Sequence, residues 1–386
     1  MNNLKRIILS FILVGVTLAF YSCDKDEPNS TPTPANRTIL VYIVATNSLG
    51  YANNDLDDIN EMLEASKYND FNNGRLIIYH ATIGQKTALK EIKQGKIHTL
   101  KEYDQSVSSV DPQRMQQVIN DTKKIAPAND YGLILWSHAN GWLQTGDNAT
   151  ISIKQTKKPL AFGVEYGKHM NITTLARVIN DENFSFIYFD CCNMASIEVA
   201  YELRHATPYI IASATEVPSD GMPYEQNIPL LFSDSNKLKD VCINTFDFYN
   251  CQSGWQRTCT ISLIKTDFLD ELAQATASIY SDFNTLPNGF SPQRFILDAT
   301  CYFFDLEHYV KALIPENHHL LNQWLDILDK VVIYKAATPQ LWEELDLTHH
   351  CGLSTYILDN NNNATTHGYN QLEWYNDVAS KLFTNK

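Results

Sequence analysis

Apolar residues alternate between two patterns from residue 38 onward. Continuous apolar runs, typical of strands buried on both faces, occupy residues 38–45, 75–80, 131–138, 185–190 and 208–214. Apolar residues at helical spacing predict helices at residues 55–67, at residues 112–124 and from residue 194 onward. Strands that alternate with helices in this way favour an α/β fold with a mostly parallel sheet.

The pattern changes near residue 236. Helices are predicted at residues 238–248, 267–282, 319–330 and 371–383, with short strands at 259–264, 331–334 and 353–358. We therefore expect an α/β domain over residues 37–235 and a C-terminal α/β subdomain over residues 236–386 that supports the edge of the sheet.

The N-terminus carries an export pattern. Lys5 and Arg6 precede an apolar run that is too short for a comfortable membrane span, so residues 1–22 are predicted to be a signal peptide. Cys23 follows Ser22 as at a bacterial lipoprotein cleavage site, which predicts a lipidated Cys23. An ordinary signal peptide with an incidental cysteine is the alternative.

Residues 23–36 are polar and proline-rich, which predicts a disordered tether. The acids behind Cys23 resemble the signal that sends Bacteroidetes lipoproteins to the outer face of the outer membrane. We therefore expect an exported outer-membrane lipoprotein, exposed at the cell surface and attached by its lipid.

The net charge and the cysteine content limit the classes of ligand that we expect this protein to bind. Residues 1–22 hold two positive charges and no negative ones, so their removal takes the formal net charge from −14 to −16. This balance argues against nucleic acid and favours basic substrates or simple solubility. Cys242 and Cys251 bracket a predicted helix and are candidates for a disulfide. No zinc-type Cys or His spacing appears, so we expect no metal or cofactor, with calcium at the polar loop 359–364 as the alternative.

Two predicted strands end in complementary chemical groups. Residues 185–190 lead into Cys191 and Cys192, and residues 131–138 end at His138. Chemistry gathers at the carboxyl ends of parallel strands, and a thiol nucleophile needs a base. We expect the strand to pass directly into a helix at the two cysteines, whose N-terminus would favour a thiolate.

The segments 137–142 (SHANGW) and 189–194 (FDCCNM) resemble the clostripain family of cysteine peptidases, as does the segment 161–164 (AFGV) between them. The resemblance implies a caspase-like three-layer sandwich. It also implies that Cys192 is the nucleophile, that His138 is the base, and that the backbone N–H groups of Ala139 and Cys192 form the oxyanion hole. Ala139 replaces a family glycine, and Cys191 replaces a family alanine.

The resemblance also implies cleavage after Arg or Lys. Asp220 lies where the family builds its S1 pocket, and Asp190 is a second candidate acid. Alternatively, Asp220 stabilises a turn and Asp190 caps a helix. The polar loop over residues 143–158, with Lys154, Lys157 and Lys158, is either a self-processing site or a surface loop.

The expected function is that of a monomeric cysteine endopeptidase acting on peptides or proteins. The alternative is a catalytically weak or inactive surface lipoprotein that binds peptide or glycan on the same fold. Ala139 is the residue that favours this alternative, because a position that requires positive φ would strain alanine.

Overall fold

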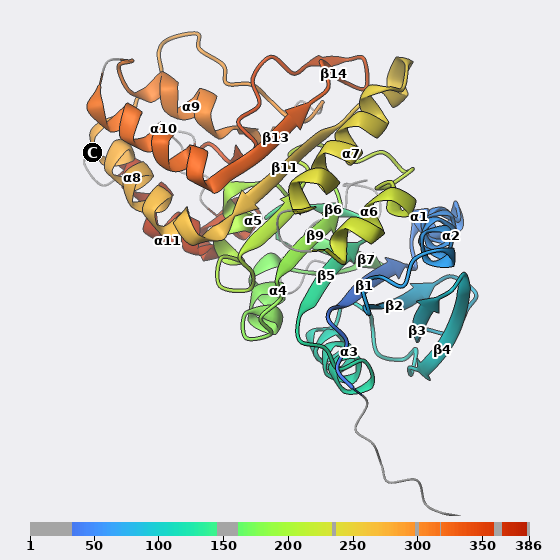
Figure 1. The fold of residues 1–386 in the computed structure, drawn as a ribbon. Coiled ribbons are helices and arrows are strands. Elements are labelled where there is room, and N and C mark those ends of the chain that lie inside the picture. The colour runs from blue at the N-terminus through green and yellow to red at the C-terminus, as the bar shows by residue number, and fades with distance from the viewer. Residues whose placement is uncertain are drawn as a thin grey trace, which may run out of the picture. The chain divides into compact units, whose positions relative to one another are not determined.

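The computed structural model describes residues 33–144, 161–233, 237–297, 301–316, 318–358 and 365–383. Residues Pro34–Lys386 form one compact unit. It is built on a nine-stranded sheet of order β13-β11-β10-β9-β5-β1-β2-β3-β4 (Figure 1). The strands are β1 (Thr38–Ala45), β2 (Arg75–Thr82), β3 (Ala88–Lys93), β4 (Lys96–Glu102), β5 (Tyr131–Trp136), β9 (Phe186–Asp190), β10 (Tyr209–Ala212), β11 (Thr260–Lys265) and β13 (Val332–Ala337).

The five central strands, β10-β9-β5-β1-β2, are parallel. Their registers bring the carboxyl ends together: Trp136 of β5 pairs with Asp190 of β9 on one side and with Ile43 of β1 on the other. The loops that follow β1, β5 and β9 therefore leave the sheet at one edge.

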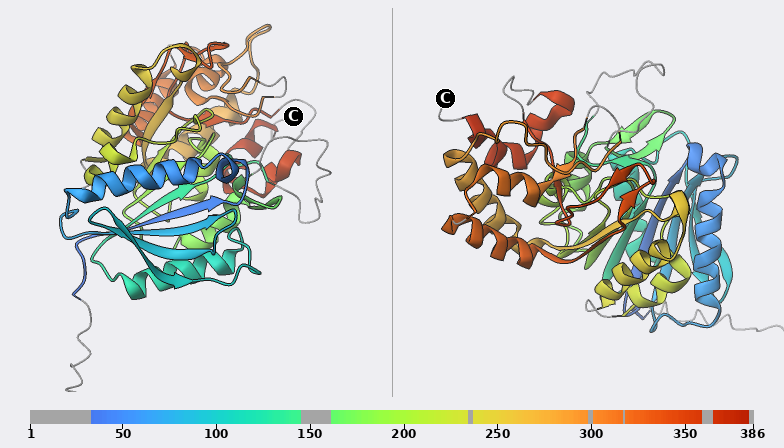
Figure 2. Two further views of the ribbon diagram at one scale, coloured as in Figure 1. Left: turned by 90° about the vertical axis from the view of Figure 1, so that its right-hand side faces the viewer. Right: turned by 90° about the horizontal axis from the view of Figure 1, so that it is seen from above.

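Helices cover both faces of the sheet (Figure 2). One face carries α2 (Asn54–Lys67), α6 (Tyr224–Leu231) and α7 (Leu238–Asn250), which enclose one apolar core. The other face carries α3 (Pro112–Ile125), α4 (Ile172–Ile179) and α5 (Ile197–Glu202), which enclose a second core. These layers confirm the predicted α/β sandwich with a mostly parallel sheet.

The C-terminal elements continue the same sheet. β11 pairs antiparallel with β10, and β13 pairs antiparallel with β11. The accompanying helices are α8 (Leu269–Asp282), α9 (Leu306–Leu313), α10 (His319–Val331) and α11 (Glu373–Asp377). Buried Trp324 and Trp374 belong to the core that also holds α3, α4 and α5.

Several elements differ from the prediction. The β3–β4 hairpin was not predicted, because β4 is mostly exposed and β3, although it buries Ala88, Leu89 and Ile92, interrupts them with charged residues and so lacks a continuous apolar run. The strand predicted at residues 353–358 is reduced to β16 (Ser354–Thr355), which pairs with β12 (Phe304–Asp305) outside the main sheet. The predicted bridge is absent, since Cys242 is a buried free thiol and Cys251 is an exposed one.

Short elements complete the described chain. They are α1 (Ser48–Tyr51), β6 (Ala139–Asn140), β7 (Ala161–Glu165), β8 (Lys168–Met170), β14 (Gln340–Leu341), β15 (Leu345–Asp346), and the 3-10 helices η2 (Gly254–Gln256), η3 (Thr266–Phe268), η4 (Thr366–Gln371) and η5 (Ala379–Phe383). Within the described ranges, none of the helices combines the length and apolarity needed to cross a bilayer.

Candidate active site

A cavity of about 450 Å³ lies at the carboxyl edge of the central strands. The loops that follow β1, β5, β9 and β10 form it, together with one residue of the C-terminal region. Its lining comprises Leu49, Trp136, Ser137, His138, Ala139, Asn140, Asp190, Cys191, Cys192, Asn193, Glu216, Val217, Pro218, Ser219, Gly221 and Trp342. The two segments that suggested a Cys/His pair in the sequence therefore share one cavity.

Cys192 lies in a turn between β9 and α5. The helix begins only at Ile197, and Ser196 caps it by accepting a hydrogen bond from the Val199 N–H. The prediction that the strand passes directly into a helix at the cysteines is therefore wrong. The N–H group that contacts the sulfur comes from Val217 and not from a helix N-terminus; it donates to Cys192 Sγ at 3.3 Å.

Cys191 has the opposite environment. Its side chain is 2% exposed and its thiol donates to the Leu135 carbonyl oxygen at 3.1 Å. Burial raises the pKa of this thiol well above its ordinary value. Cys192 is only partly buried, so it is the cysteine of the pair whose environment suits a nucleophile.

His138 follows β5 and contacts the segment that follows β1. Its Nε2 lies 2.7 Å from Ser48 Oγ, and Ser48 is the first residue of α1, which Asn47 caps. Burial lowers the pKa of His138, so the imidazole is neutral near neutral pH. Ser48 was not identified from the sequence, because only the fold brings residue 48 next to residue 138.

An amide pair joins the loops of the cysteine and the histidine. Asn193 Nδ2 donates to Asn140 Oδ1 at 3.0 Å, and both residues are buried. Gly141 has φ +59°, and a Cβ there would lie 2.8 Å from the Asn193 carbonyl oxygen. The neighbouring Ala139 pairs with Phe162 of β7 and is not among the residues with positive φ. The alanine is therefore not strained, which removes the argument for an impaired site.

The two candidate S1 acids lie in different places. Asp190 lines the cavity, is 6% exposed, and accepts hydrogen bonds from the Tyr224 hydroxyl (2.8 Å) and the Met222 N–H (3.3 Å). Asp220 is exposed and does not line the cavity. The geometry therefore reverses the order of preference drawn from the sequence. The turn places Ser219 and Gly221 against the cavity and Asp220 outside it.

A further acid, Asp58 of α2, lies beside Asp190. It is 2% exposed and accepts from Trp136 Nε1 at 2.5 Å. The position of a Cβ on Gly221 would be 2.8 Å from Asp58 Oδ2 and 3.1 Å from Asp190 Oδ2, so both carboxyl groups face the same glycine. Burial raises the pKa of both acids, that of Asp190 to about 6, and the charge of Asp190 raises that of Asp58 further.

Asp58 was missed in the sequence because helical periodicity was read only from apolar residues. Asp55 and Asp58 are three residues apart on the buried face of α2, beside Ile59 and Met62. Asp55 is matched by His80, whose Nε2 lies 2.7 Å from Asp55 Oδ2. The sequence signal that could have identified Asp58 is the presence of carboxylates on an otherwise apolar helix face.

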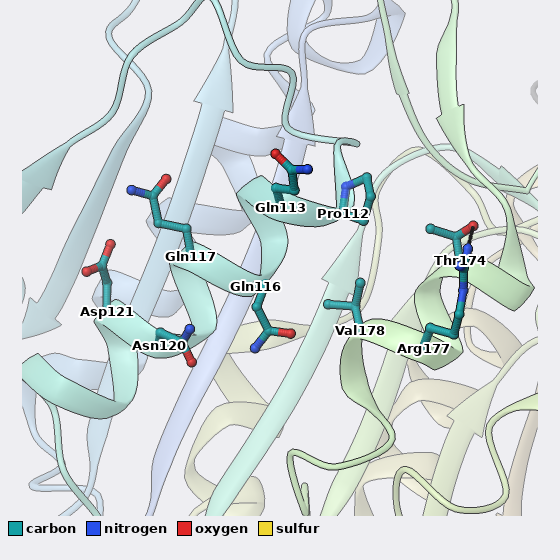
Figure 3. A pocket seen from close by; sticks show the side chains of 9 residues that line it. All are labelled: Pro112, Gln113, Gln116, Gln117, Asn120, Asp121, Thr174, Arg177 and Val178. Atoms are coloured by element: carbon teal, nitrogen blue, oxygen red, sulfur yellow. Dashed lines mark hydrogen bonds between the residues drawn. The ribbon is translucent and has the colours of Figure 1, made fainter.

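A second cavity, of about 550 Å³, lies between α3 and α4 (Figure 3). Its lining is mostly amides and other polar groups: Pro112, Gln113, Gln116, Gln117, Asn120, Asp121, Thr174, Arg177 and Val178. It contains neither cysteine nor histidine, so the Cys/His chemistry belongs to the first cavity.

Other predicted positions lie outside the described residues. They are the signal and lipidation segment with Cys23, the loop lysines Lys154, Lys157 and Lys158, and the candidate calcium loop 359–364. In the part of the chain that the structure describes, His, Cys, Asp and Glu side chains form no group of three or more that could hold a metal ion.

Comparisons with known proteins bear on this site. A family model described as "Clostripain family" matches residues 41–386. A secreted C11 cysteine protease from Bacteroides thetaiotaomicron, solved with an irreversible peptide inhibitor, is 27% identical, with a TM-score of 0.76 over 89% of this chain and 99% of that chain. An inactive zymogen C11 protease from Parabacteroides distasonis is 29% identical, with a TM-score of 0.75 over 90% of this chain and 99% of that one. No curated protein sequence matches the chain.

Proposed function

Because the chain belongs to the clostripain family of cysteine proteases, we propose that it is an endopeptidase that hydrolyses peptide bonds after Arg or Lys, with Cys192 as nucleophile and His138 as base. Its fold and family make it a cysteine peptidase. The proposal adds the two catalytic residues and the preference for a basic P1 side chain.

The observation that carries the basic preference is the buried pair of acids, Asp58 and Asp190. Among the described residues, the groups with the largest effects on the pKa values of the two carboxyls are neutral donors and other acids. Burying a carboxylate without a cation costs several kcal/mol. An Arg or Lys side chain of the substrate, entering the cavity that Asp190 lines, would supply the missing positive charge.

The proposed reaction is acyl transfer to sulfur. His138 takes the Cys192 proton, the sulfur attacks the carbonyl carbon, and the C–N bond breaks as His138 returns the proton to the leaving amine. Water, deprotonated by His138, then attacks the thioester carbon and releases the acid and the thiol. Ser48 contacts Nε2 of His138, which leaves Nδ1 for the sulfur. The backbone N–H groups of Ala139 and Cys192 are the proposed oxyanion donors.

The experiment is the substitution Asp190→Asn, which keeps the shape of the side chain and removes its charge. The ratio of kcat/KM for basic over neutral P1 substrates should fall roughly tenfold to a hundredfold, the worth of one charge-assisted contact. Asp220→Asn is the matched control and should leave the ratio unchanged. The proposal fails if the parent enzyme prefers neutral P1 residues, or if only the Asp220 variant loses selectivity.

Two further parts of the proposal concern processing and location. The loop lysines Lys154, Lys157 and Lys158 are proposed as a self-cleavage site, supported by the relative described as an inactive zymogen. The polar loop 359–364 is also proposed to bind calcium through its side-chain oxygens. The protein is proposed to act as a monomer anchored by lipid at Cys23 on the outer membrane, with no nucleic-acid partner.

A further inference from the structure

The hairpin of β14 and β15 carries a tryptophan into the cavity from the far end of the chain. Trp342 lines the cavity together with Cys192 and Val217. Its Nε1 donates to Glu216 Oε2 at 3.0 Å. The next residue, Val217, donates its N–H to Cys192 Sγ. The residue that binds the indole, Glu216, is therefore the chain neighbour of the residue that contacts the sulfur, Val217.

The backbone of Trp342 adopts an uncommon conformation. Its φ is +55°, and that of Glu343 is +60°. These two residues form the turn of the β14–β15 hairpin, in which the Glu344 N–H donates to the Leu341 carbonyl oxygen at 3.0 Å. A bulky residue is uncommon at such a position. Here the Trp342 N–H donates to Thr258 Oγ1 at 3.2 Å, which holds the main chain while Glu216 holds the ring.

A second aromatic side chain extends this surface. Trp255 of η2 is 59% exposed, and its ring centroid lies 6.2 Å from that of Trp342, with the planes inclined by 31°. A large exposed aromatic side chain next to a cavity is typical of a binding surface. The cavity thus combines an acidic region at Asp190 with an aromatic wall at Trp342.

We infer that Trp342, extended by Trp255, forms the S2 subsite and selects substrates with a large apolar or aromatic P2 side chain. This inference rests on the proposed function, in which the cavity binds a peptide with its P1 side chain near Asp190. An extended peptide advances about 3.3 Å per residue. A residue next to P1 is therefore within reach of a wall that is fixed beside Val217, and we assign this residue to P2.

The test compares two peptides that share a P1 Arg and differ at P2, one with Phe and one with Gly. Full-length wild-type enzyme should cleave the Phe peptide with the higher kcat/KM. Trp342→Ala should lower the Phe-to-Gly ratio roughly 10- to 100-fold, because a large apolar side chain loses its contact area. Trp342→Phe, which keeps a ring but loses the N–H to Glu216, should retain most of the ratio.

Tyr68→Ala is the matched control, since Tyr68 is an exposed aromatic residue outside the cavity. The ratio is insensitive to the fraction of folded enzyme, so a partly unfolded Trp342 variant still gives an answer. An unchanged ratio in Trp342→Ala, or a change that follows P3 instead of P2, overturns the inference. Failure of the proposed function would give a different result, because the wild-type enzyme would then not cleave after Arg or Lys. In that case the P2 ratio would be measured with the P1 residue that the enzyme accepts.

Discussion

Cys191 and Cys192 are adjacent in the chain and lie in different environments. The Cys191 thiol is buried and bonded to the Leu135 carbonyl oxygen, while Cys192 is partly exposed at the cavity. Both residues line the cavity, but Cys191 directly follows β9 and is buried against β5, whereas Cys192 lies in the turn and contacts Val217. Chemistry at the residue scale therefore depends on which of the two thiols is accessible.

Replacing each cysteine separately tests this assignment. Cys192→Ala should abolish hydrolysis of peptides with a basic P1 residue, because it removes the nucleophile. Cys191→Ala should retain most of the turnover, since a small side chain still fills that core position. Steady-state kinetics with a P1 Arg peptide measures both. Turnover that survives in the Cys192 variant and is lost in the Cys191 variant would reverse the assignment.

The acid pair predicts how selectivity depends on pH. The pKa of Asp190 is raised to about 6, so protonation removes the charge that attracts a basic P1 side chain as the pH falls through 6. The ratio of kcat/KM for basic over neutral P1 substrates should therefore be high above pH 7 and should decline toward pH 5. Normalising to the neutral substrate cancels the titration of His138.

The matched variant for this profile is Asp58→Asn. Burial and the charge of Asp190 raise the pKa of Asp58 well above its ordinary value, whereas Asp58 is not among the groups that raise the pKa of Asp190. Asp58 is therefore protonated where Asp190 titrates, and the midpoint of the profile should stay near pH 6 in the variant. A midpoint that moves to lower pH would mean that an ionised Asp58 acts on Asp190, and a ratio independent of pH in the parent enzyme would exclude Asp190 as the S1 acid.

At the scale of elements, α5 connects the cysteine turn to the C-terminal region through buried acids. Glu198 accepts hydrogen bonds from the Thr355 hydroxyl (3.0 Å) and the Tyr356 N–H (2.8 Å). Burial raises the pKa of Glu198 to about 7, and that of Glu202 also to about 7. The helix after the cysteine turn is thus held by carboxyl groups that are easier to bury in their protonated form.

This arrangement predicts a loss of stability with rising pH. The native state holds these protons more tightly than the unfolded chain does, so the free energy of unfolding should fall between about pH 4.5 and pH 7, by a few kcal/mol at most. Glu198→Gln, which cannot ionise, should show a smaller fall. Urea unfolding at pH 5 and pH 8 measures the difference. An equal fall in the two proteins would show that Glu198 does not contribute.

At the scale of the whole molecule, the predicted lipid at Cys23 decides where the enzyme acts. Acyl chains on Cys23 would embed in the bilayer and would hold the protein at the membrane. The wild-type protein should therefore fractionate with the outer membrane, and Cys23→Ala should be released in soluble form, as blotting of cell fractions would show. A wild-type protein found only in the soluble fraction would contradict the anchor.

Local patterns in the sequence determined much of the scaffold and the two candidate reacting groups. Buried parallel strands are continuous apolar runs, so β1 was predicted to the residue. A cysteine and a histidine that follow two such strands line one cavity because parallel strands bring their carboxyl ends to one edge. The β3–β4 hairpin was not foreseen, since β4 is an exposed edge strand and β3 has charged residues among its buried ones, so neither carries such an apolar run.

Only the tertiary structure decided the surroundings of these groups. Ser48 beside His138, Asp58 beside Asp190 and Trp342 beside Val217 are all contacts between segments far apart in the chain. Periodicity reports which face of an element is buried, and it contains no information on what that face meets. The choice of Asp190 over Asp220 likewise depended on how one turn packs against the cavity, which is a property of the folded chain.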